Sequence, residues 1–92
     1  MGFVYILKLV DGSYYIGSCR EIISRLENHK NGYVKSTKYK LTFILVYVKE
    51  FVSYKEAYNE ERRIKGWKKR KSIENLYTLD TNNKVNSYAP IV

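Results

Sequence analysis

The sequence has a single cysteine, a single histidine and no long apolar run. Cys19 is the only cysteine among the 92 residues, so an intramolecular disulfide and a cysteine-rich metal site are excluded. No apolar run approaches the ~20 residues that a spanning helix needs, and residues 3–9 are too short for a secretory signal. There is no phosphate-cradling glycine loop and no His/Cys cluster with zinc spacing. We therefore expect a cytoplasmic protein without a membrane partner, whose metal chemistry would use carboxylate and water ligands and hence Mg²⁺ or Mn²⁺.

Basic residues, in contrast, are abundant. Lysine and arginine number 17 against nine acidic residues, which gives a formal net charge of +8. Such an excess in a short chain favours a polyanionic partner such as DNA, RNA or an acidic membrane surface, the alternative being a basic protein with no such partner. The length suits one domain, predicted at 1–80. The polar residues 81–92 are expected to form a loosely held tail, with Tyr88 and Ile91 as candidates for contact with the core.

Two aromatic, β-branched runs near the N-terminus predict a β-hairpin. Residues 3–7 and 14–17 flank an Asp-Gly-Ser turn at 11–13, which is a strong hairpin signal. Antiparallel pairing would bring the phenols of Tyr5 and Tyr15 within reach of each other. Gly17 leaves the backbone open to a close approach. The alternative is a sheet covered by amphipathic tyrosines with no further role.

A helix is predicted over residues 20–30. Its apolar face has 3.6-residue spacing and consists of Ile22, Ile23, Leu26 and His29. Gly32 supplies the left-handed residue that ends such a helix. Arg25 lies at the edge of this face, one turn before His29. For His29 the alternative is an ordinary hydrogen-bonded core histidine, and for Arg25 a solvated helix charge.

The second half of the chain predicts a strand followed by a helix. Residues 43–51 are almost continuously apolar, so we expect a strand that is buried on both faces or central in a small sheet. Ser53 and Glu56 form a capping box that opens the helix. Glu61 falls within an apolar stripe made of Tyr54, Ala57, Tyr58 and Ile64. A carboxylate there is unfavourable unless it meets a cation or a metal, the alternative being an i,i+4 pair with Lys65.

Two basic segments are candidates for contact with a phosphate backbone. Residues 62–71 hold seven basic residues and no acid around Trp67, with a turn or two of helix predicted at 72–76. Residues 33–42 interleave lysines with tyrosines and hydroxyl residues, as in a loop that lies along a nucleic acid. The alternative for the basic block is a solvated face. The candidate nucleic-acid contacts are Gly17, Lys35, Lys38, Lys65, Lys68, Lys69, Arg70 and Lys71.

The order of these residues resembles the GIY-YIG nuclease superfamily. It is most similar to small, stand-alone, single-domain members related to the nuclease module of the excision-repair excinuclease. The resemblance runs over residues 3–76 and rests on Tyr5, Tyr15-Ile16-Gly17, Arg25, His29 and Glu61 in that order. The first half-motif reads Phe3-Val4-Tyr5 in place of Gly-Ile-Tyr, so only its tyrosine is retained.

The resemblance implies an α+β fold, with a three-stranded antiparallel sheet flanked by helices in ββαβα order. It also implies hydrolysis of DNA phosphodiester bonds with one divalent ion, Mg²⁺ or Mn²⁺, held by Glu61. Tyr5 would be the general base or would position water, helped by Tyr15. Arg25 would stabilise charge on the pentavalent phosphate. His29 would hold Tyr5 or exchange a proton, and all of these side chains would line one cleft.

The sequence therefore predicts a metal-dependent endonuclease that selects nicked or branched DNA by structure, in repair or recombination. One alternative is a basic nucleic-acid-binding module that keeps the fold without cutting. A second alternative is a protein-interaction domain within a repair or mobile-element assembly.

Overall fold

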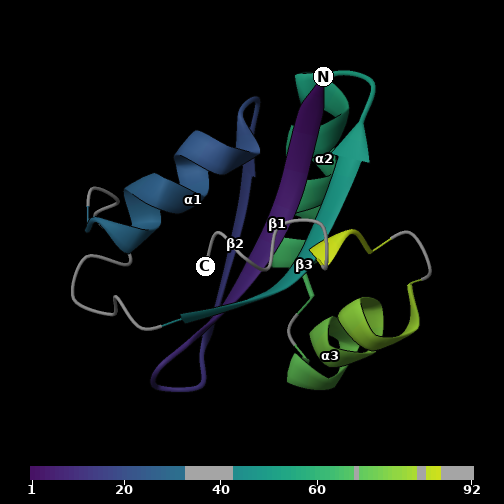
Figure 1. The fold of residues 1–92 in the computed structure, drawn as a ribbon. Helices are drawn as coiled ribbons and strands as arrows, with labels where there is room; N and C mark the ends of the chain where they lie inside the picture. Colours follow the sequence, from purple (N-terminus) through teal and green to yellow (C-terminus); the bar gives the residue numbers. More distant parts are fainter. Residues whose placement is uncertain (33–42, 68, 81–82, 86–92) are drawn as a thin grey trace.

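The computed structural model describes residues 1–32, 43–67, 69–80 and 83–85. Along the chain the elements are β1 (Gly2–Leu9), β2 (Tyr14–Cys19), α1 (Ile22–Lys30), β3 (Phe43–Phe51), α2 (Tyr54–Lys65) and α3 (Arg70–Leu79) (Figure 1). The predicted α+β class and ββαβα order are confirmed. The turn or two of helix predicted at 72–76 is a ten-residue helix, α3, which adds a further helix to the order.

The three strands form one antiparallel sheet in the order β2-β1-β3. Of the two alternatives predicted for residues 43–51, the central place in the sheet is not found, because β3 is an edge strand and β1 lies in the middle. The prediction of burial on both faces holds, since Leu45 and Val48 of β3 join one core and Tyr47 joins the other. A near-continuous apolar run therefore reflects helices on both faces of the sheet rather than a central place within it.

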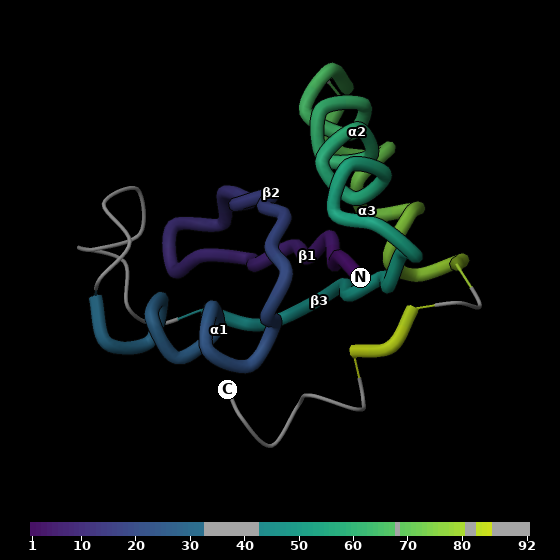
Figure 2. The backbone as a smooth tube through the Cα atoms, turned by 90° about the horizontal axis from the view of Figure 1, so that it is seen from above, coloured from purple at the N-terminus to yellow at the C-terminus, as the bar shows by residue number. Residues whose placement is uncertain are grey.

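The sheet separates two hydrophobic cores. Because successive strand residues point to opposite faces, Tyr5 and Leu7 of β1 pack beneath α1, whereas Val4 and Ile6 pack beneath α2 and α3. Seen from above, α1 lies on one side of the strands and the other two helices on the opposite side (Figure 2). Every residue of β1 except Lys8 is buried.

Local signals set the turns and helix ends. Gly12 has a φ of 84° in the predicted hairpin turn, where the Asp11 carboxylate accepts a hydrogen bond from the Ser13 N–H. Gly32 has a φ of 77° just after α1, as predicted. The Ser53 hydroxyl caps α2 by accepting the Glu56 N–H. Ile23 does not belong to the apolar face of α1, because it is 51% exposed, one helical step of 100° from Ile22.

The described part of the C-terminal segment is tied to the free edge of β3. The Asn83 side chain accepts the Val48 N–H and donates to the Val46 carbonyl, and the Lys84 N–H donates to the Val48 carbonyl. Residues 83–85 are therefore held more firmly than the expected tail. The rest of residues 81–92, including Tyr88 and Ile91, lies outside the described residues, and the domain division at 80 stays a prediction. None of the described helices is both long and apolar enough to cross a membrane.

Candidate active site

The hairpin places the Tyr5 ring directly over Gly17. The two residues are Cα partners in the antiparallel pairing of β1 and β2. A Cβ added to Gly17 would lie 2.6 Å from both Cζ and Oη of Tyr5. The predicted close approach to Gly17 is therefore made by a tyrosine of the same hairpin. This ring occupies the space beside Gly17, which is itself buried.

Tyr5, Tyr15 and His29 form one aromatic cluster between the sheet and α1. Tyr5 Oη lies 2.7 Å from His29 Nε2. The Tyr15 ring centroid lies 4.7 Å from that of His29 and 6.1 Å from that of Tyr5. Tyr5 and His29 are fully buried, whereas Tyr15 is partly exposed. The predicted proximity of the two tyrosines is confirmed, and Tyr5 is hydrogen-bonded to His29.

Burial sets the protonation of this cluster. It raises the pKa of Tyr5 well above the ordinary value of a phenol, with the nearby Tyr15 acting in the same direction. Burial, with a smaller contribution from the positive charge of Arg25, lowers the pKa of His29 to about 4. The short hydrogen bond therefore joins a neutral phenol to a neutral imidazole at neutral pH.

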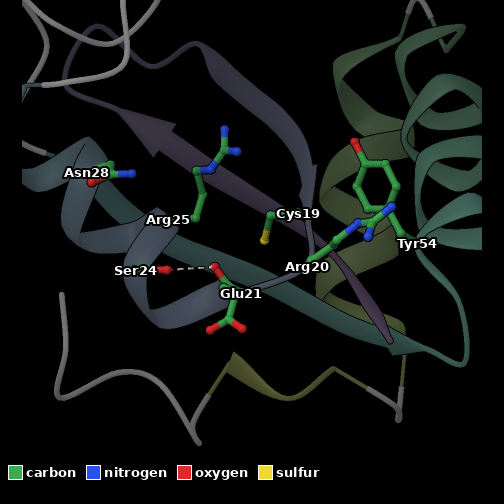
Figure 3. A pocket seen from close by; sticks show the side chains of 7 residues that line it. All are labelled: Cys19, Arg20, Glu21, Ser24, Arg25, Asn28 and Tyr54. Carbon is green, nitrogen blue, oxygen red and sulfur yellow. Dashed lines mark hydrogen bonds between the residues drawn. The ribbon is translucent and has the colours of Figure 1, made fainter.

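Arg25 lines a pocket of about 390 Å³ bordered by α1, the end of β2 and the start of α2 (Figure 3). Arg20 and Arg25 border this pocket from opposite sides, with Cys19 between them (Figure 3). Burial raises the pKa of the Cys19 thiol to about 11, so this sulfur is protonated and is a poor nucleophile at neutral pH. The remaining lining residues are Glu21, Ser24, Asn28 and Tyr54.

Glu61 lies on α2 and contacts the sheet from the face opposite to α1. Its Oε1 accepts a 2.6 Å hydrogen bond from the Ser18 hydroxyl, and its Oε2 lies 2.8 Å from Lys65 Nζ. The Glu61 side chain is 12% exposed. The ion pair considered as the alternative is thus present, together with a second partner. Ala57 of the predicted stripe is buried, whereas Tyr58 is 42% exposed and lies outside the stripe.

The end of β2 joins these two groups of side chains. Gly17 and Cys19 belong to the α1 face of the sheet, whereas Ser18 faces α2 and binds Glu61. The aromatic cluster and Arg25 therefore lie on one side of this strand end and Glu61 on the other. The pocket that Arg25 lines does not include Glu61 among its described lining residues. Sequence reasoning missed Ser18, for which the available signal was a polar residue directly after Tyr15-Ile16-Gly17.

The described basic residues differ in their contacts. Lys65 pairs with Glu61, and Arg70 Cζ lies 5.0 Å from the Tyr14 ring centroid. Lys69 and Lys71 are exposed. Three of the other predicted nucleic-acid contacts, Lys35, Lys38 and Lys68, lie outside the described residues.

Comparison with known proteins places these features in context. The family model of the GIY-YIG catalytic domain matches residues 1–77. UPF0213 proteins of Staphylococcus aureus strains Mu3 and Mu50 are each 36% identical over 72 residues, which span 77% of this chain and 88% of the relative. The solution NMR structure of a UPF0213 protein from Bacillus halodurans is similar, with a TM-score of 0.58 and 32% identity. That match covers 95% of this chain and 94% of the other.

Proposed function

Because the chain belongs to the GIY-YIG catalytic-domain family, we propose that it is an endonuclease that hydrolyses DNA phosphodiester bonds with one divalent ion. One observation carries this proposal: a guanidinium and a carboxylate flank the same end of β2. Arg25 lies beside Cys19 on one side, and Glu61 binds Ser18 on the other. Phosphoryl transfer needs both a cation that stabilises the phosphate and a ligand for a metal.

Glu61 fits a hard divalent ion. The described residues contain no group of three or more His, Cys, Asp or Glu side chains that could cage a metal. Mg²⁺ needs no such cage, because it keeps several waters and is held through one or two carboxylates plus substrate phosphates. The Lys65 ammonium already stands against Glu61 Oε2, and this lysine is 55% exposed. Because the Lys65 ammonium lies largely in solvent, it can leave this position for water when an ion binds Glu61. When bound, the ion would neutralise charge on the phosphate and on the leaving oxygen.

Arg25 supplies the fixed positive charge of the proposed site. Its positive charge adds to the effect of burial in lowering the pKa of His29, and it opposes the larger effect of burial, which raises the pKa of Cys19. The planar fork of an arginine matches two phosphate oxygens at once. We assign Arg25 to the negative charge that grows on the pentavalent phosphate.

The burial of Tyr5 changes the roles of the two tyrosines. A general base must reach the attacking water, and Tyr5 is fully buried with a raised pKa. Tyr15 is partly exposed and lies next to His29, so we propose that Tyr15 contacts the water. Tyr5 and His29 then act as positioning residues that hold the Tyr15 ring.

The preferred substrate in this proposal is nicked or branched DNA, with a role in repair or recombination. Lysine and arginine contacts to phosphates position a protein on DNA without reading its sequence. The test is incubation of supercoiled plasmid and of a branched duplex with Mg²⁺, Mn²⁺ or a chelator. Metal-dependent cleavage that is stronger on the branched substrate supports the proposal, and intact DNA under every condition contradicts it. The choice between the two ions and the cytoplasmic location remain predictions.

One observation favours a second candidate, a DNA-binding module that does not cut. Both carboxylate oxygens of Glu61 already have partners, in Ser18 and Lys65. This candidate predicts salt-dependent DNA binding without cleavage in any metal. The same assay, paired with a binding measurement, separates the two.

A further inference from the structure

Four side chains form a continuous stack on the surface beside α2. Arg20 Cζ lies 5.1 Å from the Tyr54 ring centroid, and the Tyr54 and Tyr58 rings are stacked at 6.3 Å with 29° between their planes. Arg62 Cζ lies 5.9 Å from the Tyr58 centroid. Tyr58 is 42% exposed, and both arginines are exposed. We call Arg20, Tyr54, Tyr58 and Arg62 the Arg–Tyr ladder.

The Arg–Tyr ladder borders both halves of the proposed site. Tyr58 precedes Glu61 by three residues, so the two side chains are neighbours on the surface of α2. Arg20 follows Ser18, the partner of Glu61, by two residues. Arg20 and Tyr54 also line the pocket that contains Arg25 (Figure 3). The ladder therefore extends from the Arg25 pocket to the side of α2 that carries Glu61.

Two stacked aromatic rings with a guanidinium at each end suit unpaired nucleotides. Bases stack on aromatic rings while arginines contact the phosphates, and stacking of this kind needs base faces that a duplex keeps covered. Stacking of a base on an aromatic side chain is stronger than an exposed cation–π contact. A base can therefore replace a guanidinium on a tyrosine face, which frees the arginine for a phosphate.

We propose that the Arg–Tyr ladder binds unpaired nucleotides of a DNA strand next to the scissile phosphate. The substrate class is then DNA that carries a single-stranded segment. This inference rests on the proposed function for the position of the scissile phosphate, whereas the binding itself does not require cleavage. Glu21 and Glu61 lie beside the ladder and oppose phosphate binding, whereas Arg20, Arg25 and Arg62 favour it.

The experiment measures binding of an oligo-dT of about 12 nucleotides in the presence of a chelator, by fluorescence anisotropy. Tyr58→Leu keeps an apolar side chain but removes the aromatic face, and Tyr58→Phe keeps that face. We expect the leucine variant to bind about tenfold more weakly and the phenylalanine variant to match the wild type. A blunt duplex of equal length and an abasic oligomer of equal charge should bind all three proteins equally.

The inference would be overturned if Tyr58→Leu lost the same affinity for the oligo-dT and for the abasic oligomer, or lost affinity for neither. Tyr58 is exposed, so both variants should keep the wild-type urea midpoint, and this shows that any change in binding is local. If the protein cleaves branched DNA but its binding of oligo-dT does not depend on Tyr58, the proposed role of the ladder is rejected and the nuclease function is supported. If binding depends on Tyr58 but no DNA is cleaved, the role of the ladder is supported and the nuclease function is rejected.

Discussion

Tyr5 and His29 are 24 residues apart in the sequence, yet their side chains share a buried hydrogen bond of 2.7 Å between Oη and Nε2. This bond fastens α1 to the central strand of the sheet. It also fixes the ring against which Tyr15 packs, 4.7 Å away between centroids. The orientation of the partly exposed Tyr15 phenol thus depends on two fully buried side chains, Tyr5 and His29.

The depressed pKa of His29 predicts a loss of stability in acid. The unfolded chain binds a proton near the ordinary value of 6.5, whereas folded His29 does so only near 4. Between these values the unfolded state holds more protons, so the free energy of unfolding falls as the pH is lowered. We expect a loss of roughly 1–3 kcal/mol across this window in urea titrations. In His29→Gln the same titration should be flatter, and an equal slope would assign the acid sensitivity to other groups.

Gly17→Ala should destabilise the fold. The added Cβ would lie 2.6 Å from the Tyr5 ring, which is packed in the core. Overpacking of this kind costs about 1–3 kcal/mol, measured as a shift of the urea midpoint. Gly66→Ala is the matched control, because Gly66 has helical backbone angles and its added Cβ would come no closer than 3.3 Å to the nearest atom. The loss of stability in the double variant Gly17→Ala/Tyr5→Leu should be smaller than the sum of the losses in the two single variants, because the shorter side chain leaves room for the added methyl group. A fully additive loss would contradict this explanation.

These features show which parts of the structure can be predicted from local sequence. The hairpin turn, the Ser53 cap and the end of α1 at Gly32 follow from the preferences of a few adjacent residues, so they were predicted. The Tyr5–Tyr15 neighbourhood follows from hairpin pairing. The edge position of β3 arises because β1, and not β3, pairs with both of the other strands. The local pattern of apolar residues does not determine which strand takes the central position.

The same limit applies to the candidate site. The position of Glu61 in the helix predicted that it needs a partner, but not that Ser18 would be one, because that contact joins residues 43 positions apart. The burial of Tyr5 likewise depends on α1 covering the sheet. The hold of Asn83 on the edge of β3 comes from tertiary contacts within a segment whose composition suggests a tail.

The two tyrosines should differ in their effect on cleavage. Tyr15→Phe removes the partly exposed phenol and should lower kcat by about 10²- to 10⁴-fold, the range of general acid–base contributions. It should leave the urea midpoint nearly unchanged. Tyr5→Phe should mainly lower stability, by about 0.5–1.5 kcal/mol for one hydrogen bond. A larger fall in kcat for Tyr5→Phe, with no loss of stability, would return the water-contacting role to Tyr5.

Neutralisation of exposed lysines should weaken DNA binding through electrostatics. Lys69→Gln combined with Lys71→Gln removes two exposed charges at the start of α3. If both contact phosphates, the slope of log K against log salt should shrink by about 2. Lys55→Gln, at an exposed position on α2, serves as the reference for loss of a charge elsewhere. An unchanged slope in the double variant would show that this end of α3 faces away from DNA.

The most direct test of the account is the metal-dependent cleavage rate of Glu61→Gln beside that of Glu60→Gln. Both variants remove a carboxylate from α2, but Glu60 pairs with Arg63 whereas Glu61 binds Ser18 at the end of β2. We predict that Glu61→Gln abolishes cleavage of branched DNA while its DNA binding stays near that of the wild type, and that Glu60→Gln still cleaves. Cleavage by Glu61→Gln at the wild-type rate would contradict the account, because it would remove the proposed metal ligand from the site.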